Sequence, residues 1–237
     1  MKNILLGERF EFVHESMGGA NFYFSTAYNE ISFKIDENEG ILNIDKLKEI
    51  INLKEIKYLK QLHSDIIKVN PKSEEIGDAI ICKEKNIGIG VFTADCAPIL
   101  IFDKDTKAMA AVHSGWRGTY KLILLKTLQK MKEEYGTKAE NIIAYIGPHN
   151  GVCCYEVGQG VNEEFKKEDF YKNKNIFEEK NLNITDCLRY QLHSFGVLDH
   201  NILDSNLCTY CAKDYKLHSY RKTGVNSGRL FSFLYYR

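Results

Sequence analysis

The stretch NIGIGVFTADCAPILIFDKDTKAMAAVH (residues 86–113) consists of three short apolar segments separated by two polar turns. The apolar segments, 86–92, 99–102 and 107–113, are typical of buried strands, and the intervening TADCAP and DKDT carry the Asp and Pro residues that favour turns. We expect the three strands to form a meander in one sheet. The first and third strands would then run in the same direction and end at the same sheet edge.

On both sides of this stretch, helical and strand-like patterns are intermixed. Helical spacing of apolar residues is found at 44–53, 120–135, 159–168 and 184–197. Apolar segments typical of strands lie at 58–70, 141–147 and 229–237. Gly136 and Gly196 are natural C-terminal stops for two of the helices. Because no repeat or long linker interrupts the order, the sequence predicts an α+β fold with mixed β-sheets in a single domain, 1–237.

The composition describes a folded protein with balanced charge. Of 237 residues, 44% are hydrophobic and 12% aromatic, which supplies one sizeable core and excludes disorder as the main state. The 32 basic and 32 acidic residues cancel, so we expect no nucleic-acid partner. No apolar run approaches the roughly 20 residues that span a bilayer, so we expect no membrane partner. An odd number of cysteines and an N-terminus unlike a signal peptide favour a cytoplasmic location.

Two histidines and a cysteine are candidates for one metal site. Cys96 follows the first strand of the expected meander and His113 ends the third, about 10 Å apart across the sheet, a gap that loop curvature can close. His63 in QLHSD lies in another apolar segment. One thiolate and two imidazoles suit Zn²⁺, and three protein ligands leave a position open for chemistry. The alternative is that the histidines satisfy ordinary contacts and Cys96 is a small buried apolar residue.

Other candidate residues carry weaker signals. Arg117 in SGWRGT, beside small residues and a helix start, is a candidate anion or phosphate site, although it could equally cap a turn. Arg221 and Arg229 either face an anionic substrate or lie on a solvated hairpin. The loop GPHNGVCCYEVG (147–158) could line a pocket. For the single CxxC of LCTYC (207–211), packing is the favoured interpretation.

Several motifs occur in an order that resembles the YfiH/YlmD family of bacterial proteins, whose vertebrate relatives include laccase domain-containing protein 1. The motifs are QLHSD, GDA, TADCAPILIFD, AVHSGWRGT, IGPHNGVCCYEVG and a late C-T followed by SYR and GR, and they cover residues 61–237. The resemblance implies an α/β/β/α layered fold and a zinc site formed by His63, Cys96 and His113. Residues 1–60 are the divergent part, with Ala27 where family members usually have Arg.

The resemblance also implies an activity. It implies a zinc-dependent purine nucleoside enzyme that phosphorolyses adenosine, inosine and methylthioadenosine to the base and the sugar 1-phosphate, and that also deaminates adenosine. Arg117 and Arg221 would then bind substrate or phosphate, and Asp95 would either shuttle a proton or support the turn next to Cys96.

Three alternatives stand beside this activity. Copper-dependent polyphenol oxidation is one, but seven histidines and no HxH pair are few for a multicopper centre. A second is a metal-free hydrolase with Cys96 as nucleophile and His113 as base. The third is a binding protein that keeps zinc for stability.

Overall fold

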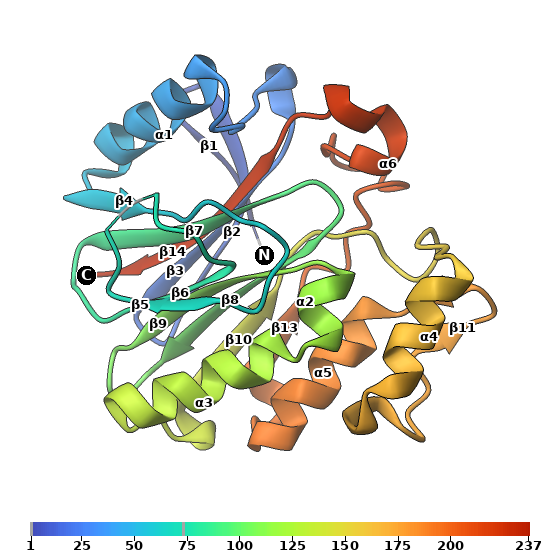
Figure 1. Ribbon diagram of the computed structural model, residues 1–237. Coiled ribbons are helices and arrows are strands. Elements are labelled where there is room, and N and C mark those ends of the chain that lie inside the picture. The colour runs from blue at the N-terminus through green and yellow to red at the C-terminus, as the bar shows by residue number, and fades with distance from the viewer. Residues whose placement is uncertain (1, 73) are drawn as a thin grey trace.

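The computed structural model describes residues 2–72 and 74–237 as two six-stranded sheets packed face to face, with helices on both outer sides (Figure 1). The first sheet has the order β1 (Lys2–Leu6), β2 (Phe10–Met17), β3 (Ala20–Ser25), β14 (Leu230–Tyr236), β7 (Ile87–Thr93) and β4 (Glu55–Lys57). The second has the order β13 (Ile202–Asp204), β10 (Ile142–Ile146), β8 (Ala97–Asp103), β9 (Met109–Ser114), β6 (Ala79–Cys82) and β5 (Ile67–Val69). Each sheet contains parallel and antiparallel pairs, so both are mixed.

Helices cover the two outer faces. The α-helices are α1 (Asn38–Ile51), α2 (Trp116–Tyr120), α3 (Ile123–Tyr135), α4 (Gln159–Lys167), α5 (Ile184–Phe195) and α6 (Tyr220–Thr223). Short 3₁₀ helices lie at Tyr28–Glu30, Ala139–Asn141, Asp169–Tyr171, Asp199–Asn201 and Gly224–Asn226, and β11 (Phe177–Glu178) pairs with β12 (Asn181–Leu182). α1 lies on the side of the first sheet, and α2 to α5 lie on the side of the second (Figure 1). None of the described helices is long and apolar enough to cross a membrane.

Alternation along single strands builds the layers. In β8, Ile99 and Ile101 pack into the core under the helices, whereas Leu100 and Phe102 pack into the core between the sheets. A third core lies between the first sheet and α1, where Leu47 is fully buried. Strands buried on both faces require apolar side chains at successive positions, which is why residues 86–113 contain continuous apolar runs. The α+β fold with an α/β/β/α arrangement is therefore confirmed.

The helix ends also follow the sequence. α3 ends at Gly136 and α5 at Gly196, and both glycines adopt left-handed backbone angles, with φ of 70° and 100°. Glycine adopts this conformation without the steric cost that a β-carbon brings. Both predicted stops are confirmed.

The expected meander is wrong. β7 pairs with β14 and β4 in the first sheet, whereas β8 and β9 pair with each other in the second. The turn TADC therefore carries the chain from one sheet to the other. All three strands are buried on both faces, so their apolar pattern does not distinguish the two sheets.

The single strand expected at 58–70 is also wrong. Only Ile67–Val69 forms a strand there, and the part around His63 is irregular. The physical reason is the Asp78 carboxylate. It accepts hydrogen bonds from the backbone amides of residues 62 to 64 at 2.7 to 3.2 Å, which removes those donors from any sheet ladder.

Candidate active site

A cavity of about 820 Å³ lies beside the predicted metal ligands. Its lining comes from distant parts of the sequence, with Lys34, Ile35, Asp36, Leu59, Gln61, His63, Phe92, Thr93, Ala94, Asp95, Cys96, His113, Tyr155, Tyr220, Arg221 and Arg229. Its volume falls within the usual range for small-molecule sites. The N-terminal region, from which no site residue was expected, supplies Lys34, Ile35 and Asp36.

His63 is held in place by its loop. Its backbone has a left-handed φ of 57°, and its N–H donates to Asp78 Oδ1 at 3.0 Å. The hydroxyl and the amide of Ser64 both donate to Asp78 Oδ2, at 2.6 and 2.7 Å. Burial raises the pKa of Asp78, but its hydrogen bonds to His113 and Ser64 outweigh burial and lower that pKa to about 2. The carboxylate is therefore ionised and fixes the conformation that presents His63 to the cavity.

His113 ends β9 and is oriented by the same carboxylate. Its Nδ1 donates to Asp78 Oδ1 at 2.8 Å, and its backbone N–H donates to Asp78 O at 2.7 Å. With Nδ1 occupied, Nε2 is the ring nitrogen left for a ligand. A carboxylate behind an imidazole is the usual arrangement for a metal-ligating histidine.

Cys96 reaches His113 by a different route from the one expected. In the β8–β9 hairpin, Ala97 lies opposite Ser114 and Pro98 opposite His113. Cys96 immediately precedes this hairpin, so the two groups lie on adjacent strands rather than two strand spacings apart. Cys96 Sγ lies 3.6 Å from His63 Nε2. The structure thus brings the predicted residues together, although not through the predicted meander.

The geometry and chemistry of the three groups fit one Zn²⁺. Their ligand atoms all lie within 4.8 Å of one another. A β-carbon built on Gly115 would lie 2.9 Å from Cys96 Sγ and 3.0 Å from His63 Cδ2, so this position leaves room for the ligands only as glycine. Two imidazoles and one thiolate, with the fourth coordination position open, are typical ligands of a catalytic zinc ion.

The charges of the site favour an ionised thiol. Burial raises the pKa of Cys96, but the charge and hydrogen bond of His113 outweigh it and lower that pKa to about 6. Burial lowers the pKa of His113, but Cys96 and Asp78 outweigh it and raise that pKa to about 9. A thiolate is the form of cysteine that binds a metal or attacks as a nucleophile.

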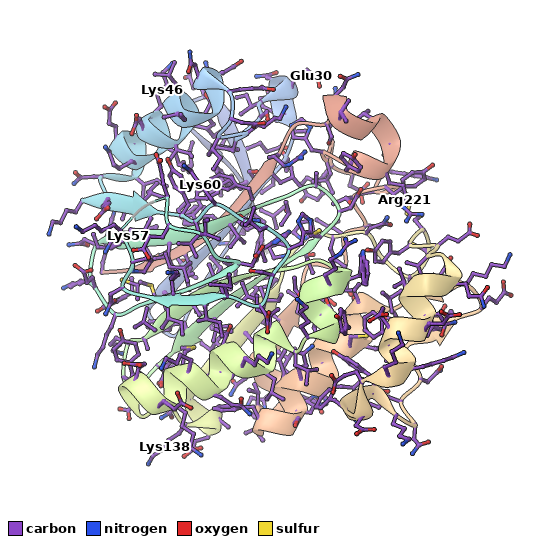
Figure 2. The ribbon with its side chains drawn as sticks, viewed as in Figure 1. Glu30, Lys46, Lys57, Lys60, Lys138 and Arg221 are labelled. Atoms are coloured by element: carbon purple, nitrogen blue, oxygen red, sulfur yellow. The ribbon has the colours of Figure 1, made fainter. Side chains whose placement is uncertain are left out.

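The two arginines among the predicted site residues are placed differently. Arg221 lines the cavity, and its guanidinium lies over the Tyr155 ring, 5.2 Å from the centroid (Figure 2 labels Arg221). Arg117 is exposed, lies 4.3 Å from the centroid of Trp116 and is not among the cavity-lining residues. A phosphate role for Arg117 remains a prediction.

Asp95 lies at the cavity, but both of its carboxylate oxygens are engaged. Oδ1 accepts from Thr209 Oγ1 at 2.6 Å, and Oδ2 accepts from the Arg221 backbone N–H at 2.7 Å. Its backbone carbonyl also accepts from Asn150 N at 2.9 Å. These contacts favour the interpretation in which Asp95 supports the turn and joins three loops.

Several residues of the site carried no role in the sequence interpretation. Gln61 forms two hydrogen bonds of 2.7 Å with the backbone of Phe92: its Nε2 donates to the carbonyl, and its Oε1 accepts from the N–H. Asp78 stands in the GDA motif, and Tyr155 follows the paired cysteines. These residues could have been singled out, because each lies in one of the motifs quoted above. The spacing of the motifs alone does not indicate which residues they contact.

Comparisons with known proteins identify the family of this chain. A family model described as multi-copper polyphenol oxidoreductase laccase matches residues 24–237. The match begins upstream of the motifs that carry the resemblance, which cover 61–237.

Curated relatives match as well. A purine nucleoside phosphorylase of Clostridium acetobutylicum is 44% identical over 234 residues, which is 98% of this chain and 98% of the relative. Adenosine deaminase RL5, from an unknown prokaryotic organism, is 34% identical over 163 residues, 67% of this chain and 62% of the relative.

Solved structures share the fold. YfiH from Bacillus licheniformis superposes with a TM-score of 0.84 at 21% identity and covers 96% of each chain. YlmD from Geobacillus stearothermophilus has the same TM-score and identity and covers 94% of each chain. Since the family model spans most of the chain and one relative matches nearly all of it, the chain belongs to the YfiH/YlmD family, whose model is described as multi-copper polyphenol oxidoreductase laccase.

Proposed function

We propose that this chain is a zinc-dependent purine nucleoside enzyme. It phosphorolyses adenosine, inosine and methylthioadenosine, and deaminates adenosine, in the cavity beside His63, Cys96 and His113. The observation that carries the proposal is the convergence of two imidazoles and one ionised thiol on a single point in a cavity of about 820 Å³. The names of the relatives, purine nucleoside phosphorylase and adenosine deaminase, support the choice of substrate.

The cavity supplies surfaces that suit a purine nucleoside. The rings of Phe92, Tyr155 and Tyr220 line it and provide flat apolar faces for a base. Burial raises the pKa of Tyr155, so its hydroxyl stays protonated and can donate a hydrogen bond.

Two arginines supply the positive charge that phosphate requires. In the described part of the chain, the Arg221 guanidinium donates one hydrogen bond, to Glu156 O, and the Arg229 guanidinium donates to the carbonyls of Ser227 and Gly228. Neither guanidinium forms an ion pair within the described part of the chain, so their charge is available to an anion. A guanidinium binds phosphate through parallel N–H groups. Arg221 and Arg229 are the best-placed phosphate contacts in this cavity.

In phosphorolysis, a phosphate oxygen bonds to C1′ of the sugar while the bond between C1′ and N9 of the base breaks. The electron pair of that bond goes to N9, and the purine takes up a proton as it leaves. The arginines hold the attacking anion and the aromatic residues orient the base, so the reactants meet in one geometry. A zinc ion held by His63, Cys96 and His113 would polarise a substrate oxygen or activate water there.

The test combines metal analysis with product identification. Purified protein is expected to contain zinc. With phosphate, adenosine should yield adenine and ribose 1-phosphate; without phosphate, it should yield inosine and ammonia. His63→Ala should abolish both reactions, while His193→Ala, which removes an exposed histidine paired with Asp199, should preserve them. Failure of adenosine, inosine and methylthioadenosine to react in either condition would exclude the proposal.

Two other activities are distinguished by the same preparation. The description of the family model names copper and polyphenols, so copper-loaded protein should be offered a phenol; turnover of the phenol without turnover of nucleosides would favour that activity. The 3.6 Å between Cys96 Sγ and His63 Nε2 also permits a thiolate nucleophile. A thiol enzyme would keep its activity after chelation and lose it after alkylation.

A further inference from the structure

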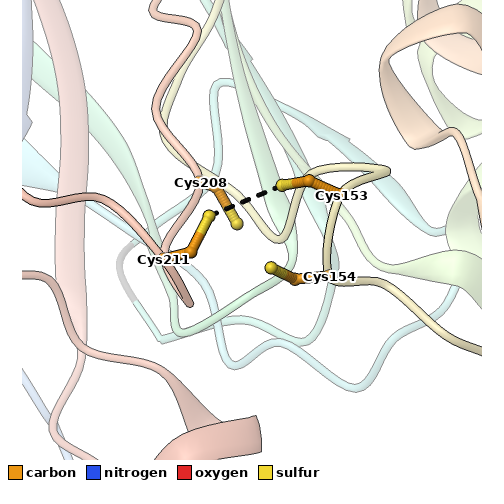
Figure 3. Close-up of side chains that lie close together, drawn as sticks. All are labelled: Cys153, Cys154, Cys208 and Cys211. Atoms are coloured by element: carbon orange, nitrogen blue, oxygen red, sulfur yellow. Dashed lines mark hydrogen bonds between the residues drawn. The ribbon is translucent and has the colours of Figure 1, made fainter.

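Four cysteines outside the cavity lie together. Cys153 and Cys154 come from the loop after β10, and Cys208 and Cys211 from the loop after β13. The four sulfur atoms all lie within 4.8 Å of one another, with 3.5 Å between those of Cys153 and Cys211. Figure 3 shows the side chains pointing toward a common centre. All four are free thiols.

The spacing of the sulfurs matches one small ion. A tetrahedral ion with metal–sulfur bonds of ~2.3 Å places its four sulfurs about 3.8 Å apart. Four thiolates in this arrangement select zinc or iron over metals that prefer oxygen ligands.

The backbone presents the adjacent cysteines to the same side. The N–H groups of Cys154 and Tyr155 both donate to Gly151 O at 2.9 Å, which closes a tight turn around the pair. Gly151 also packs against the second loop: a β-carbon there would lie 3.5 Å from Cys208 Cβ. The turn therefore places Cys153 and Cys154 directly beside the loop that carries Cys208.

A buried amide lies against the sulfur of Cys208. Asn150 is 1% exposed, and its Nδ2 has no hydrogen-bond partner in the described part of the chain. Oδ1 of the same amide lies 3.8 Å from Cys208 Sγ. A metal-bound thiolate has no proton to donate, so it could only accept from this amide; a flip would turn Nδ2 toward the sulfur and move Oδ1 to the unpartnered position. The Gly151 N–H already donates to the same sulfur at 3.4 Å.

We propose that Cys153, Cys154, Cys208 and Cys211 bind a second zinc ion, in a closed structural site. Four protein ligands leave no open position, in contrast to the three-ligand site at the cavity. The ion fastens two loops that also hold the cavity wall. Tyr155, next to Cys154, lines the cavity, and Thr209, next to Cys208, donates to Asp95. The proposal concerns stability and loop position, so it stands apart from the nucleoside reaction.

The first experiment counts zinc by inductively coupled plasma mass spectrometry. The wild type should contain about two zinc ions per chain. Cys211→Ser and His63→Ala should each contain about one, and Cys187→Ala, which alters a buried cysteine outside both clusters, should contain about two. An unchanged zinc content in Cys211→Ser would overturn the proposal, as would about one zinc per wild-type chain that is lost entirely in His63→Ala.

A second experiment begins with the wild type, so that its first part does not depend on the folding of a variant. Wild-type protein is titrated with a mercurial thiol reagent while a coloured chelator records zinc release. One zinc per chain should be released as the four clustered thiols react. Cobalt-loaded His63→Ala should show the intense thiolate-to-cobalt absorption of a four-sulfur site. Release of iron instead of zinc, or a native mass that shows a disulfide and no bound metal, would overturn the assignment.

Discussion

Asp78 and His113 form a buried hydrogen-bonded pair, with 2.8 Å between Asp78 Oδ1 and His113 Nδ1. The same carboxylate holds the loop that carries His63. One side chain therefore positions two of the three ligand residues, which come from segments 50 residues apart in sequence.

Replacement of this carboxylate should loosen both ligands together. Asp78→Asn is expected to lower zinc affinity at the cavity about 10–100-fold, as does loss of other groups that orient metal-ligating histidines. The affinity is measured by competition with a chelator of known strength. Asp65→Asn, which changes a carboxylate paired with Lys126 near the surface, serves as the control. Equal affinity in the two variants would show that Asp78 does not orient the ligands.

The phosphate contact is tested by replacing Arg221 and, for comparison, Arg117. Arg221→Ala is expected to raise the KM for phosphate roughly tenfold or more, because a charged hydrogen-bonding group is lost. The zinc content should stay the same. Arg117→Ala is the matched variant, since that side chain is exposed and lies against Trp116. A rise confined to Arg117→Ala would place the phosphate at the start of α2 instead.

A single methyl group should disturb the proposed zinc site. Gly115 has ordinary backbone angles, with φ of −74° and ψ of 173°, so Gly115→Ala adds a steric contact without backbone strain. The contact falls on Cys96 Sγ and the His63 ring. We expect zinc affinity to fall roughly tenfold or more. Gly160→Ala, in α4 with no atom within 4 Å of the added carbon, should retain full affinity.

Acid should destabilise the protein through His218. Burial lowers the pKa of His218 below 6.5, although its Nε2 donates to Ile31 O at 2.9 Å; Arg229 and Lys216 lower it further. The unfolded chain therefore binds a proton that the folded chain does not. The resulting stability is complete above the unfolded pKa of 6.5 and declines as the pH falls toward the folded pKa.

His218→Gln keeps a donor for Ile31 O but cannot titrate. Between about pH 7 and pH 5, the melting temperature of the wild type should fall more steeply than that of His218→Gln. Parallel slopes would show that His218 is not the titrating group. His193→Gln, in which an exposed histidine is altered, should keep the wild-type slope.

Local pattern predicted the elements of the fold more reliably than their partners. Glycine stops and apolar stripes placed α3 and α5 correctly, because helix spacing is a local property. One of the two partners of β7 is β14, more than 130 residues away in sequence, and no local pattern indicates that pairing. The meander failed for this reason, although Cys96 and His113 do meet.

For the site, the sequence predicted only those properties that follow from the types of residues present. Two imidazoles and a thiol beside turns predicted zinc, and the structure brings them within 4.8 Å. The contact of Asp78 with His113 depends on how distant loops fold together, and so does the contact of Cys153 and Cys154 with Cys208 and Cys211. The spacing of these residues in the sequence does not indicate either contact. Packing was therefore the favoured interpretation for Cys208 and Cys211, whereas the structure places them against Cys153 and Cys154.

β14 lies between β3 and β7 in the first sheet, through the middle of the molecule (Figure 1). A ribosome makes this strand after every other strand described here. Until it emerges, the β1–β3 hairpins and the β4–β7 pair each present an unpaired edge with strongly apolar side chains. Completion of the first sheet thus waits for the synthesis of residues 230–236, and a chain truncated before residue 230 would be inclined to aggregate rather than to fold as a slightly smaller protein.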